Sequence, residues 1–301
     1  MNLLIDGSSL MHRVHWVSTK QPLITSSGRD VGDVFIFLRT LKSYVRIHEA
    51  EDVYIGWDKK LIYPSTNFRH TLTEQDYKGQ RDKEKNASVY DNEKLLADIL
   101  KTLGIKSMFP GVLEADDVVA WLSYNLQGPN IVISGDNDLL QLISNTTNFF
   151  HPFKKKMIDL NNFEKEVGVK KYAFLYYKAI LGDASDNIPG WYGYGKVKAR
   201  KTAELIAEDA NNLATFDKDK LTILQRNLKL MDLSKGYKIA GDLEEKLYKA
   251  QFDKFTEIEP DINEFKSICE QYEFNQFLDK FDDWKNLFRS SRLVSIINQL
   301  V

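Results

Sequence analysis

The first 160 residues alternate short aliphatic runs with longer amphipathic stretches, and no other feature of the sequence constrains the fold as strongly. The aliphatic runs predict four buried strands, at 3–6, 53–57, 106–109 and 130–134. In the stretches 33–48 and 91–103 between them, apolar residues recur at helical spacing. Strands that alternate with helices build a largely parallel sheet, so we expect an α/β fold in this half of the chain.

Beyond residue 160 the strand-like runs give way to amphipathic stretches joined by loops that contain glycine. We therefore divide the chain into an α/β domain, 1–160, and a helical domain, 161–301. Within the first domain, segment 78–92 mixes basic and acidic residues with almost no apolar periodicity, which predicts an exposed segment. Helices of the second domain are predicted at 171–181, 196–209, 221–230 and 263–281.

The composition excludes several classes of protein. The 301 residues are 43% hydrophobic and 28% charged, which is typical of a globular chain with one large domain or two smaller ones. The single cysteine, Cys269, can form neither an intramolecular disulfide nor a cysteine-rich zinc site, and its ordinary interpretation is a buried thiol. No apolar stretch approaches the ~18 residues of a membrane span and no export signal is evident. We expect a soluble, cytoplasmic monomer.

Carboxylates follow the predicted strands, at the edge where open α/β sheets bind their ligands. Each acid alone has an ordinary interpretation as a helix cap or a turn residue. Gathered at one edge, however, they would repel one another and destabilise the fold unless cations compensated them. Oxygen ligands without a neighbouring His or Cys indicate a hard divalent cation, Mg²⁺, with Mn²⁺ as a substitute. The acids are Asp6, Asp58, Glu114, Asp116, Asp117, Asp136, Asp138, Asp183 and Asp186.

So many carboxylates exceed what one Mg²⁺ ion needs, whereas two ions ~4 Å apart would use them in phosphodiester hydrolysis. That chemistry also needs cations on the scissile phosphate. Arg69, Lys78 and Arg81 follow Asp58 closely enough to supply them, although charge alone favours a solvated face for Lys78 and Arg81. The net charge of −2 lacks the basic excess of most nucleic-acid binders. Gathering the acids at one site would leave the remaining surface positive.

A glycine-rich segment near residue 190 comes close to a phosphate-binding loop. Gly190, Gly195 and Lys196 follow the P-loop pattern, but Val197 stands where that pattern requires Ser or Thr, which argues against an ATPase. Such a turn still presents backbone N–H groups to a phosphate, which favours contact with the backbone of duplex DNA. The alternative is a plain turn between helices, with Trp191, Tyr192 and Tyr194 as packing residues.

Taken together and in their order, these motifs resemble those of the structure-specific 5′ nucleases, the flap endonucleases and 5′–3′ exonucleases. The likeness is strongest to the phage enzymes and to the 5′-nuclease domain of bacterial DNA polymerase I. The resemblance implies a PIN-like core followed by a helix-hairpin-helix-type domain. The matching segments extend from residue 3 to about 199 and are LLIDGSSL, WD followed by FR and YKGQR, EADD, SGDNDLLQL and LGDASDNIPG with its glycine-rich turn.

The resemblance also implies a role for each matching residue. Segment 78–92 falls where the family has its helical arch, and the family's K⁺ ion would lie in the glycine-rich turn, where Trp191, Tyr194 and Val197 depart from the family pattern. One divalent ion would be held by Asp6, Asp58, Glu114 and Asp116, and a second by Asp136, Asp138, Asp183 and Asp186, with Asp117 close by. Lys78 and Arg81 would contact the scissile phosphate, Tyr77 would stack on an unpaired base, and Arg69, Gly190, Gly193, Gly195, Lys196 and Lys198 would contact nucleic acid.

The predicted function is Mg²⁺-dependent 5′–3′ exonuclease and flap endonuclease activity on DNA that leaves a 5′-phosphate. RNA primers in RNA–DNA hybrids are a further predicted substrate. The expected setting is replication or repair in a bacterial cell or a phage-infected host. The expected partner is a replicative polymerase or a single-strand-binding protein that docks beyond residue 200. Two alternatives stay open, a catalytically silent junction-binding protein and a PIN-type ribonuclease of single-stranded RNA; the ribonuclease leaves Asp183 and Asp186 without a role.

Overall fold

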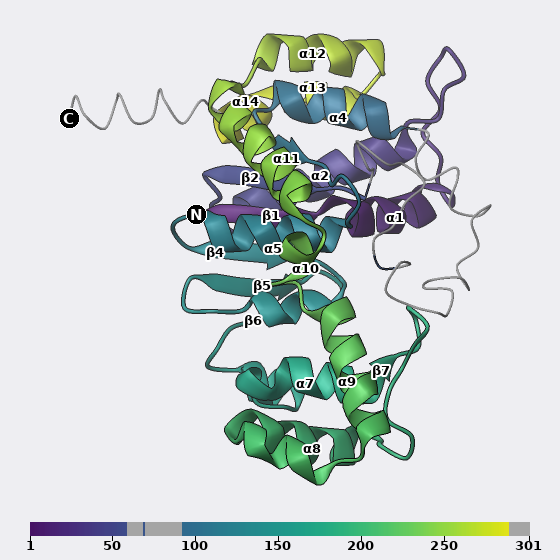
Figure 1. Ribbon diagram of the computed structural model, residues 1–301. Coiled ribbons are helices and arrows are strands. Elements are labelled where there is room, and N and C mark those ends of the chain that lie inside the picture. The colour runs from purple at the N-terminus through teal and green to yellow at the C-terminus, as the bar shows by residue number, and fades with distance from the viewer. Residues whose placement is uncertain (59–68, 70–91, 289–301) are drawn as a thin grey trace.

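A computed structural model describes residues 1–58, 69 and 92–288 (Figure 1). Its centre is a six-stranded sheet with the order β3-β2-β1-β4-β5-β6. Strands β1 to β5 are parallel to their neighbours, and only β6 at the edge runs antiparallel. The predicted α/β fold with a largely parallel sheet is thereby confirmed. The strands are β1 Asn2–Asp6, β2 Asp52–Gly56, β3 Lys106–Met108, β4 Asn130–Ile133, β5 Thr147–His151 and β6 Lys156–Ile158.

The four predicted strands correspond to β1 to β4, whereas β5 and β6 were not predicted. In β5, buried and partly exposed residues alternate, so Thr147 and Asn148 interrupt the aliphatic pattern that marks a fully buried strand. Strand β6 is only three residues long and lies at the edge of the sheet. A short edge strand carries too few apolar residues for its period to be detected.

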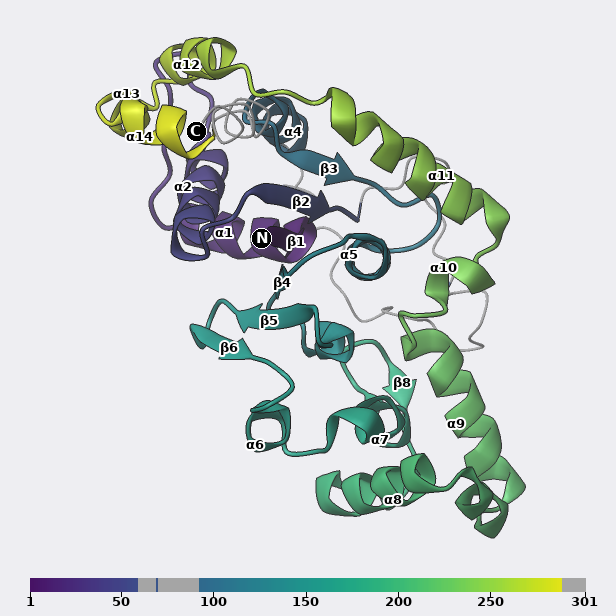
Figure 2. The same cartoon turned by 90° about the vertical axis from the view of Figure 1, so that its left-hand side faces the viewer.

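Helices cover both faces of the sheet (Figure 2). Leu3 and Ile5 of β1 point into one core together with α1, α2 and α4, while Leu4 points into the core on the opposite face together with α5. This alternation is expected because successive side chains of a strand lie on opposite faces. These helices are α1 Gly7–Ser18, α2 Gly32–Ile47, α4 Glu93–Thr102 and α5 Ala115–Asn125.

After β6 the described chain is mainly helical. Helices α7 and α8 pack against each other, and the segment between them contains two short paired strands, β7 Gly182–Asp183 and β8 Ile188–Pro189. The predicted helix-hairpin-helix motif would comprise α7 and α8 and stays a prediction. The helices are α6 Phe163–Val167, α7 Phe174–Leu181, α8 Lys196–Glu208, α9 Lys218–Met231, α10 Gly236–Ile239 and α11 Asp242–Asp253, with 3₁₀ turns at Asn137–Leu142, Lys171–Ala173, Ala210–Thr215 and Lys254–Glu257.

The last helices return to the first half of the chain. Helix α11 runs alongside the sheet, and the helices after it lie next to α2 and α4 (Figures 1 and 2). Phe277 stacks on Phe35 of α2 with ring centroids 4.5 Å apart, and the thiol of Cys269 is fully buried in the same core, as expected. The predicted division at residue 160 stays a prediction. The returning helices are α12 Ile262–Gln271, α13 Asn275–Leu278 and α14 Phe281–Leu287.

The continuous helix predicted at 263–281 is therefore wrong in its length. Helix α12 ends at Gln271, and Glu273 adopts a left-handed backbone conformation with φ 58°. A helix cannot continue through such a residue. In the described ranges, no helix is both long and apolar enough to cross a membrane.

Candidate active site

The buried carboxylate of Asp6 ties the end of β1 to two neighbouring elements. Asp6 is 4% exposed, and its Oδ1 caps α1 by accepting a hydrogen bond of 2.9 Å from the backbone N–H of Ser9. Its Oδ2 accepts a second bond of 2.9 Å from the hydroxyl of Ser134, which follows β4. The ends of β1 and β4 thus converge on one carboxylate, as the parallel pairing of these strands requires.

Asp136 is connected to the same serine. Its backbone N–H donates to the Ser134 hydroxyl oxygen at 2.9 Å, and its Oδ1 accepts from the N–H of Asp138 at 2.8 Å. The Asp136 side chain therefore caps the 3₁₀ turn Asn137–Leu142. Ser134 is the link between the acid that ends β1 and the acids that follow β4.

Asp58, after β2, is held by the starts of two helices. Its backbone N–H donates to the hydroxyl of Ser8 in α1 at 2.8 Å, and its Oδ1 accepts from the N–H of Ala115, the first residue of α5, at 2.8 Å. The positive end of a helix dipole favours an anion at this place.

Negative charge accumulates at this edge. Burial and, less strongly, the nearby carboxylates of Asp58 and Asp136 raise the pKa of Asp6 to about 7, against the opposing effect of hydrogen bonds from Ser9 and Ser134. A carboxyl group that resists ionisation in this way marks a place where a cation would be stabilised.

Arg69 forms a buried ion pair at the start of α5. Its guanidinium donates to both oxygens of Asp117, at 2.7 and 2.9 Å, and at 3.0 Å to Oε2 of Glu114. Asp117 is fully buried and also closes a capping box with the backbone N–H of Glu114. Arg69 further donates to the carbonyl oxygen of Leu230 in α9. Arg69 thus orients Glu114 and joins α9 to α5.

Lys178 of α7 bridges two more of the predicted acids, and the sequence analysis missed it. Its Nζ lies 2.7 Å from Asp138 Oδ1 and 2.9 Å from Asp183 Oδ2. Burial raises the pKa of Asp138 to about 6, although Lys178 opposes that rise. For Asp183, hydrogen bonds from Ser185 and Lys178 outweigh burial and lower the pKa. Lys178 is the one charged residue in the otherwise apolar helix FLYYKAIL, and this position was the sequence signal that could have identified it.

A small pocket of about 20 Å³ brings acids of both predicted metal groups together. Asp116 comes from α5, Asp138 from the turn after β4 and Asp186 from the connection between β7 and β8, and Leu230 and Met231 of α9 form the apolar wall. In the described part of the chain, no group of three or more His, Cys, Asp or Glu side chains already stands at metal-binding spacing. The acids at this edge nonetheless offer only oxygen donors, and burial raises the pKa of Asp138 in the pocket and of Asp6 outside it, which fits a hard divalent cation.

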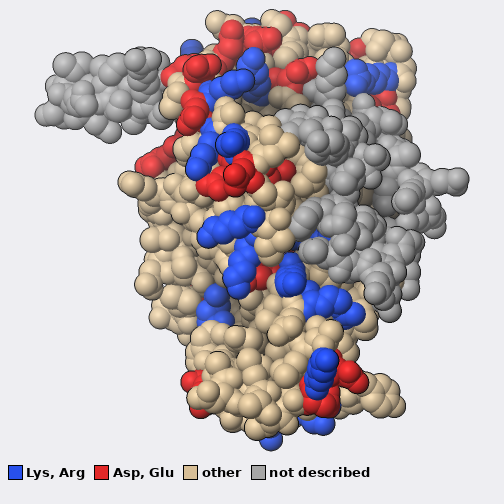
Figure 3. Space-filling view, in the orientation of Figure 1, with Lys and Arg blue, Asp and Glu red and all other residues tan. Residues whose placement is uncertain are grey.

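Basic side chains run down the middle of one face of the molecule, while acidic side chains gather over its upper part (Figure 3). The modest net charge of −2 therefore hides a segregated surface. Such a distribution suits a protein that binds a polyanion on one face.

The glycine-rich turn has both structural and exposed residues. A Cβ on Gly190 would lie 2.2 Å from the carbonyl oxygen of Leu181, so close packing excludes a side chain there. Trp191 is buried and donates to the carbonyl of Lys220, which agrees with a packing role, whereas Tyr192 is fully exposed. No side chain caps the first turn of α8, where Lys196 and Lys198 are exposed.

A comparison with protein-family sequence models matches residues 1–168 to the model described as "5′-3′ exonuclease, N-terminal resolvase-like domain". The chain belongs to the 5′–3′ exonuclease family. This family is the one that the ordered motifs of the sequence resemble, and the predicted family is thereby confirmed.

Curated relatives include stand-alone 5′–3′ exonucleases and DNA polymerases. The 5′–3′ exonuclease of Buchnera aphidicola (Acyrthosiphon pisum) is 32% identical over 193 residues, which cover 62% of this chain and 64% of the relative. That of Aquifex aeolicus is 29% identical over 291 residues, covering 93% and 94%. DNA polymerase I of Geobacillus stearothermophilus is 28% identical over 92% of this chain but only 32% of the polymerase.

Solved structures share the fold of this 5′–3′ exonuclease family member. A bacteriophage T5 protein co-crystallised with metal ions superposes with a TM-score of 0.67 at 22% identity, over 86% of this chain and 99% of that one. The bacteriophage T5 flap endonuclease in a complex with DNA and metal ions gives 0.67 at 22% identity, over 85% and 100%. The predicted fold class, with a PIN-like first domain, is confirmed.

The structure therefore brings the predicted acids of the family motifs to one edge of the sheet, in two linked groups. Asp58 and Asp136 are close enough to Asp6 to raise its pKa, and Glu114, Asp116, Asp138 and Asp186 line one pocket. The carboxylate of Asp117 forms an ion pair with Arg69. Tyr77, Lys78 and Arg81, together with the arch predicted at 78–92 except for Asn92, lie outside the described residues.

Proposed function

We propose that this chain is a divalent-metal-dependent nuclease that hydrolyses phosphodiester bonds of DNA at free 5′ ends and 5′ flaps. The observation that carries the proposal is the carboxylate of Asp6, whose pKa burial and the neighbouring Asp58 and Asp136 raise to about 7. Membership of the 5′–3′ exonuclease family supports the same reaction.

The acids would hold two Mg²⁺ ions, with Mn²⁺ able to replace them. When bound, such ions supply an activated water and stabilise the leaving oxygen. In this assignment Asp117 stays outside the metal ligands because its carboxylate is already satisfied by Arg69. We assign Asp6, Asp58, Glu114 and Asp116 to one ion and Asp136, Asp138, Asp183 and Asp186 to the other.

The chain's own cations prepare this site. Arg69 holds Glu114 toward the pocket through the 3.0 Å bond, and Lys178 keeps Asp138 and Asp183 together and favours their charged forms. A carboxylate held in its charged form is ready to bind a divalent cation. We assign contact with the scissile phosphate to Lys78 and Arg81, and stacking on an unpaired base to Tyr77.

We assign the grip on duplex DNA to the glycine-rich turn. The exposed lysines at the start of α8, Lys196 and Lys198, and the open space around Gly193 and Gly195 support this role, because a helix N-terminus favours phosphate. Arg69 would affect nucleic-acid binding only by orienting Glu114. Gly190 would affect it only by allowing the close packing that shapes the turn. A K⁺ ion in this turn is part of the proposal.

The biological role that we propose is the removal of 5′ flaps and RNA primers during DNA replication or repair. The DNA polymerase I relatives support a polymerase as partner, because the region that resembles this chain is about a third of the polymerase. A single-strand-binding protein is the second candidate partner. We propose a monomer that acts in a bacterial cell or a phage-infected host.

The test is a cleavage assay on a 5′-flap duplex with separate labels at both ends of the flap strand, in Mg²⁺, in Mn²⁺ and in EDTA. We expect metal-dependent release of an intact flap or of short 5′ fragments. Asp136→Asn and Asp183→Asn should abolish turnover and preserve DNA binding, whereas Asp282→Asn, an exposed acid of α14, should leave cleavage unchanged. Cleavage by the Asp136→Asn protein at the wild-type rate would refute the metal assignment.

The same assay separates the alternatives. Tight flap binding without cleavage in either metal would identify a silent junction-binding protein. Cleavage of a matched single-stranded RNA alone would identify a ribonuclease. The buried and mutually repelling acids support the enzyme over the silent binder, because uncompensated carboxylates destabilise a fold that has no use for them.

A further inference from the structure

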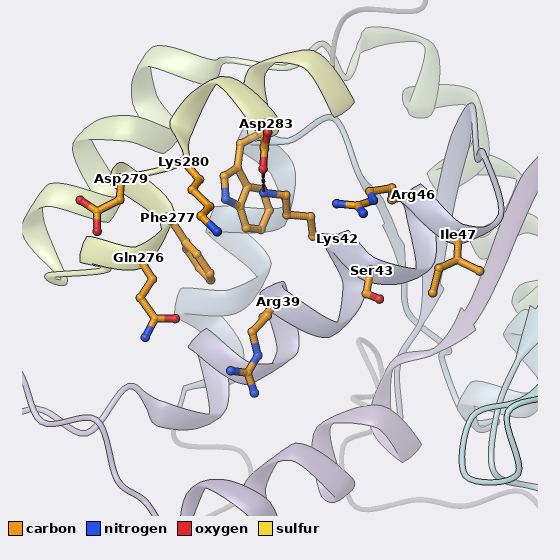
Figure 4. A pocket seen from close by; sticks show the side chains of 11 residues that line it. Arg39, Lys42, Ser43, Arg46, Ile47, Gln276, Phe277, Asp279, Lys280 and Asp283 are labelled. Carbon is orange, nitrogen blue, oxygen red and sulfur yellow. Dashed lines mark hydrogen bonds and ion pairs between the residues drawn. The ribbon is translucent and has the colours of Figure 1, made fainter.

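We propose that the pocket between α2 and the helices α13 and α14 is a docking site for a short acidic peptide of a partner protein. The pocket has a volume of about 600 Å³, within the range of sites that bind drug-sized ligands. Arg39, Lys42 and Arg46 of α2 form one wall, and Lys280, Asp283 and Trp284 belong to the other (Figure 4). The inference does not depend on the proposed nuclease activity.

Positive charge exceeds negative charge in this pocket, which is lined by four cations and by two carboxylates, Asp279 and Asp283. Arg39, Lys42 and Arg46 are spaced three and four residues apart and so lie on one face of α2. The cationic ends of Arg46 and Lys280 point toward Lys42 (Figure 4). Among the described residues, the side chains of Arg46 and Lys280 form no ion pair and no hydrogen bond, so both cationic groups are available to a ligand.

Lys42 shows the effect of this accumulation. Its Nζ lies 3.5 Å from Asp283 and 4.8 Å from the centre of the Trp284 ring. Burial lowers the pKa of Lys42, and Arg46 and Lys280 lower it further, although Asp283 opposes the shift. An anion in the pocket would relieve this repulsion between like charges.

The first pocket continues into an apolar extension, and the two together are called the groove. A second pocket of about 360 Å³ shares Arg39 and Gln276 with the first and is lined by Val17, Leu23 and Ile36. Val17 is 50% exposed, and Ile47 in the first pocket is 64% exposed. The groove therefore offers cations at one end and aliphatic side chains at the other.

This combination favours a peptide over single-stranded nucleic acid. Single strands bind on exposed aromatic rings as well as on cations, because the bases stack there. Trp284 and Phe277, the aromatic residues of the first pocket, are 0% and 4% exposed, so their ring faces are not available. A peptide with acidic residues next to aliphatic residues would complement both ends of the groove, the cations of the first pocket and the aliphatic side chains of the extension.

The carboxylate of the apolar extension sets the direction of the peptide. Glu273 lines the apolar extension, and hydrogen bonds from Ser26 lower its pKa, so it stays negatively charged. It would repel acidic residues, which directs them to the cations of the first pocket and the aliphatic residues to the extension.

The groove is separate from the acidic edge of the sheet. Arg46 and Ile47 belong to the last turn of α2, which leads to the start of β2, whereas the acids follow the ends of the strands. None of the predicted metal ligands lines either pocket of the groove. A peptide bound here would leave the acidic edge open.

The test uses a fluorescein-labelled peptide of four aspartates followed by Leu-Ile-Leu, titrated with the full chain while fluorescence anisotropy is measured at low ionic strength. We expect saturable binding that weakens as salt is added. The double substitution Arg39→Glu and Arg46→Glu should weaken binding at least tenfold. Lys285→Glu, a single charge reversal on an exposed residue of α14 outside the groove, should change it less than twofold. A peptide with Asn in place of Asp should not bind.

Several results would overturn the proposal. They are no binding by the wild-type chain, equal weakening by Lys285→Glu, or tighter binding of oligothymidylate of the same length. A loss of flap cleavage that parallels the loss of peptide binding would assign the groove to the DNA substrate instead. Binding that occurs only after deletion of residues 289–301 would assign the groove to that segment of the chain itself. Thermal unfolding of each variant verifies that it is folded.

Discussion

Lys178 and Asp138 form a half-buried ion pair, with Nζ 2.7 Å from Oδ1, and the same ammonium group lies 2.9 Å from Asp183. The lysine comes from α7, whereas Asp138 follows β4 of the sheet. A cation therefore already stands between two acids that we assign to a metal ion. Metal binding at these acids has to displace it or share them with it.

Lys178→Met should reveal this competition. Without its cation the acid pair repels, so we expect a loss of about 1–3 kcal/mol in the free energy of unfolding in EDTA. Added Mg²⁺ should restore more stability to the variant than it gives to the wild type. Thermal unfolding with and without Mg²⁺ measures the difference. Lys170→Met, which removes an exposed ion pair with Glu208, is the control, and equal Mg²⁺ stabilisation of Lys178→Met and wild type would contradict the prediction.

Arg69→Met should be among the most destabilising single changes. It leaves the fully buried carboxylate of Asp117 without its partner, which typically costs about 3–5 kcal/mol. Urea unfolding provides the measurement. The double variant Arg69→Met with Asp117→Asn should lose less than the sum of the two single variants. Additive losses would indicate that the ion pair contributes little.

Gly236→Ala should disturb the same pair from the opposite side. A Cβ at Gly236 would lie 2.3 Å from Oδ1 of Asp117, which Arg69 holds in place. We expect a loss of about 1–3 kcal/mol, typical of overpacking. Gly195→Ala is the matched control because nothing lies within 4 Å of its added carbon. Equal stability of the two variants in urea would show that Asp117 can move away.

Stability in EDTA should fall as the pH rises from 3.8 to about 7. The pKa of Asp6 is about 7 in the folded chain against an ordinary value of 3.8, so the folded state holds a proton that the unfolded state has already lost. That contribution is complete below pH 3.8 and is lost as the pH rises to about 7.

The check on this pH dependence is the melting temperature between pH 5 and 8. Asp6→Asn cannot ionise and should show a flatter profile than the wild type. Mg²⁺ should also flatten the wild-type profile, because it stabilises the charged form. A fall of the same steepness in Asp6→Asn would assign the pH dependence to other groups.

The sequence predicted the acidic edge because the position of Asp6, Asp58 and Asp136 depends on local patterns. Aliphatic runs identify the strands, and parallel strands end on the same edge of a sheet. Each acid that directly follows such a run is thereby placed near the others. No long-range information is needed beyond the parallel topology.

The partners of these acids could not be predicted in the same way. Arg69 is 48 residues from Asp117, and Lys178 is 40 residues from Asp138, so nothing local pairs them. Arg69 carries the same charge as the basic residues that follow it in the sequence, and only its contacts with α5 and α9 in the folded chain show that it is buried. The break at Glu273 is equally hidden, because a left-handed backbone at a glutamate has no clear sequence signal.

Phe265, Phe274 and Trp284 complete the core that begins with Leu3 and Ile5. During synthesis the chain emerges from the ribosome N-terminus first, and that core cannot close until residues near 288 have left the exit tunnel. Until then one face of the sheet stays partly uncovered. Because the first core includes the last helices, we expect chaperones to bind the nascent chain. We also expect fragments that stop before α12 to be degraded rapidly by proteases.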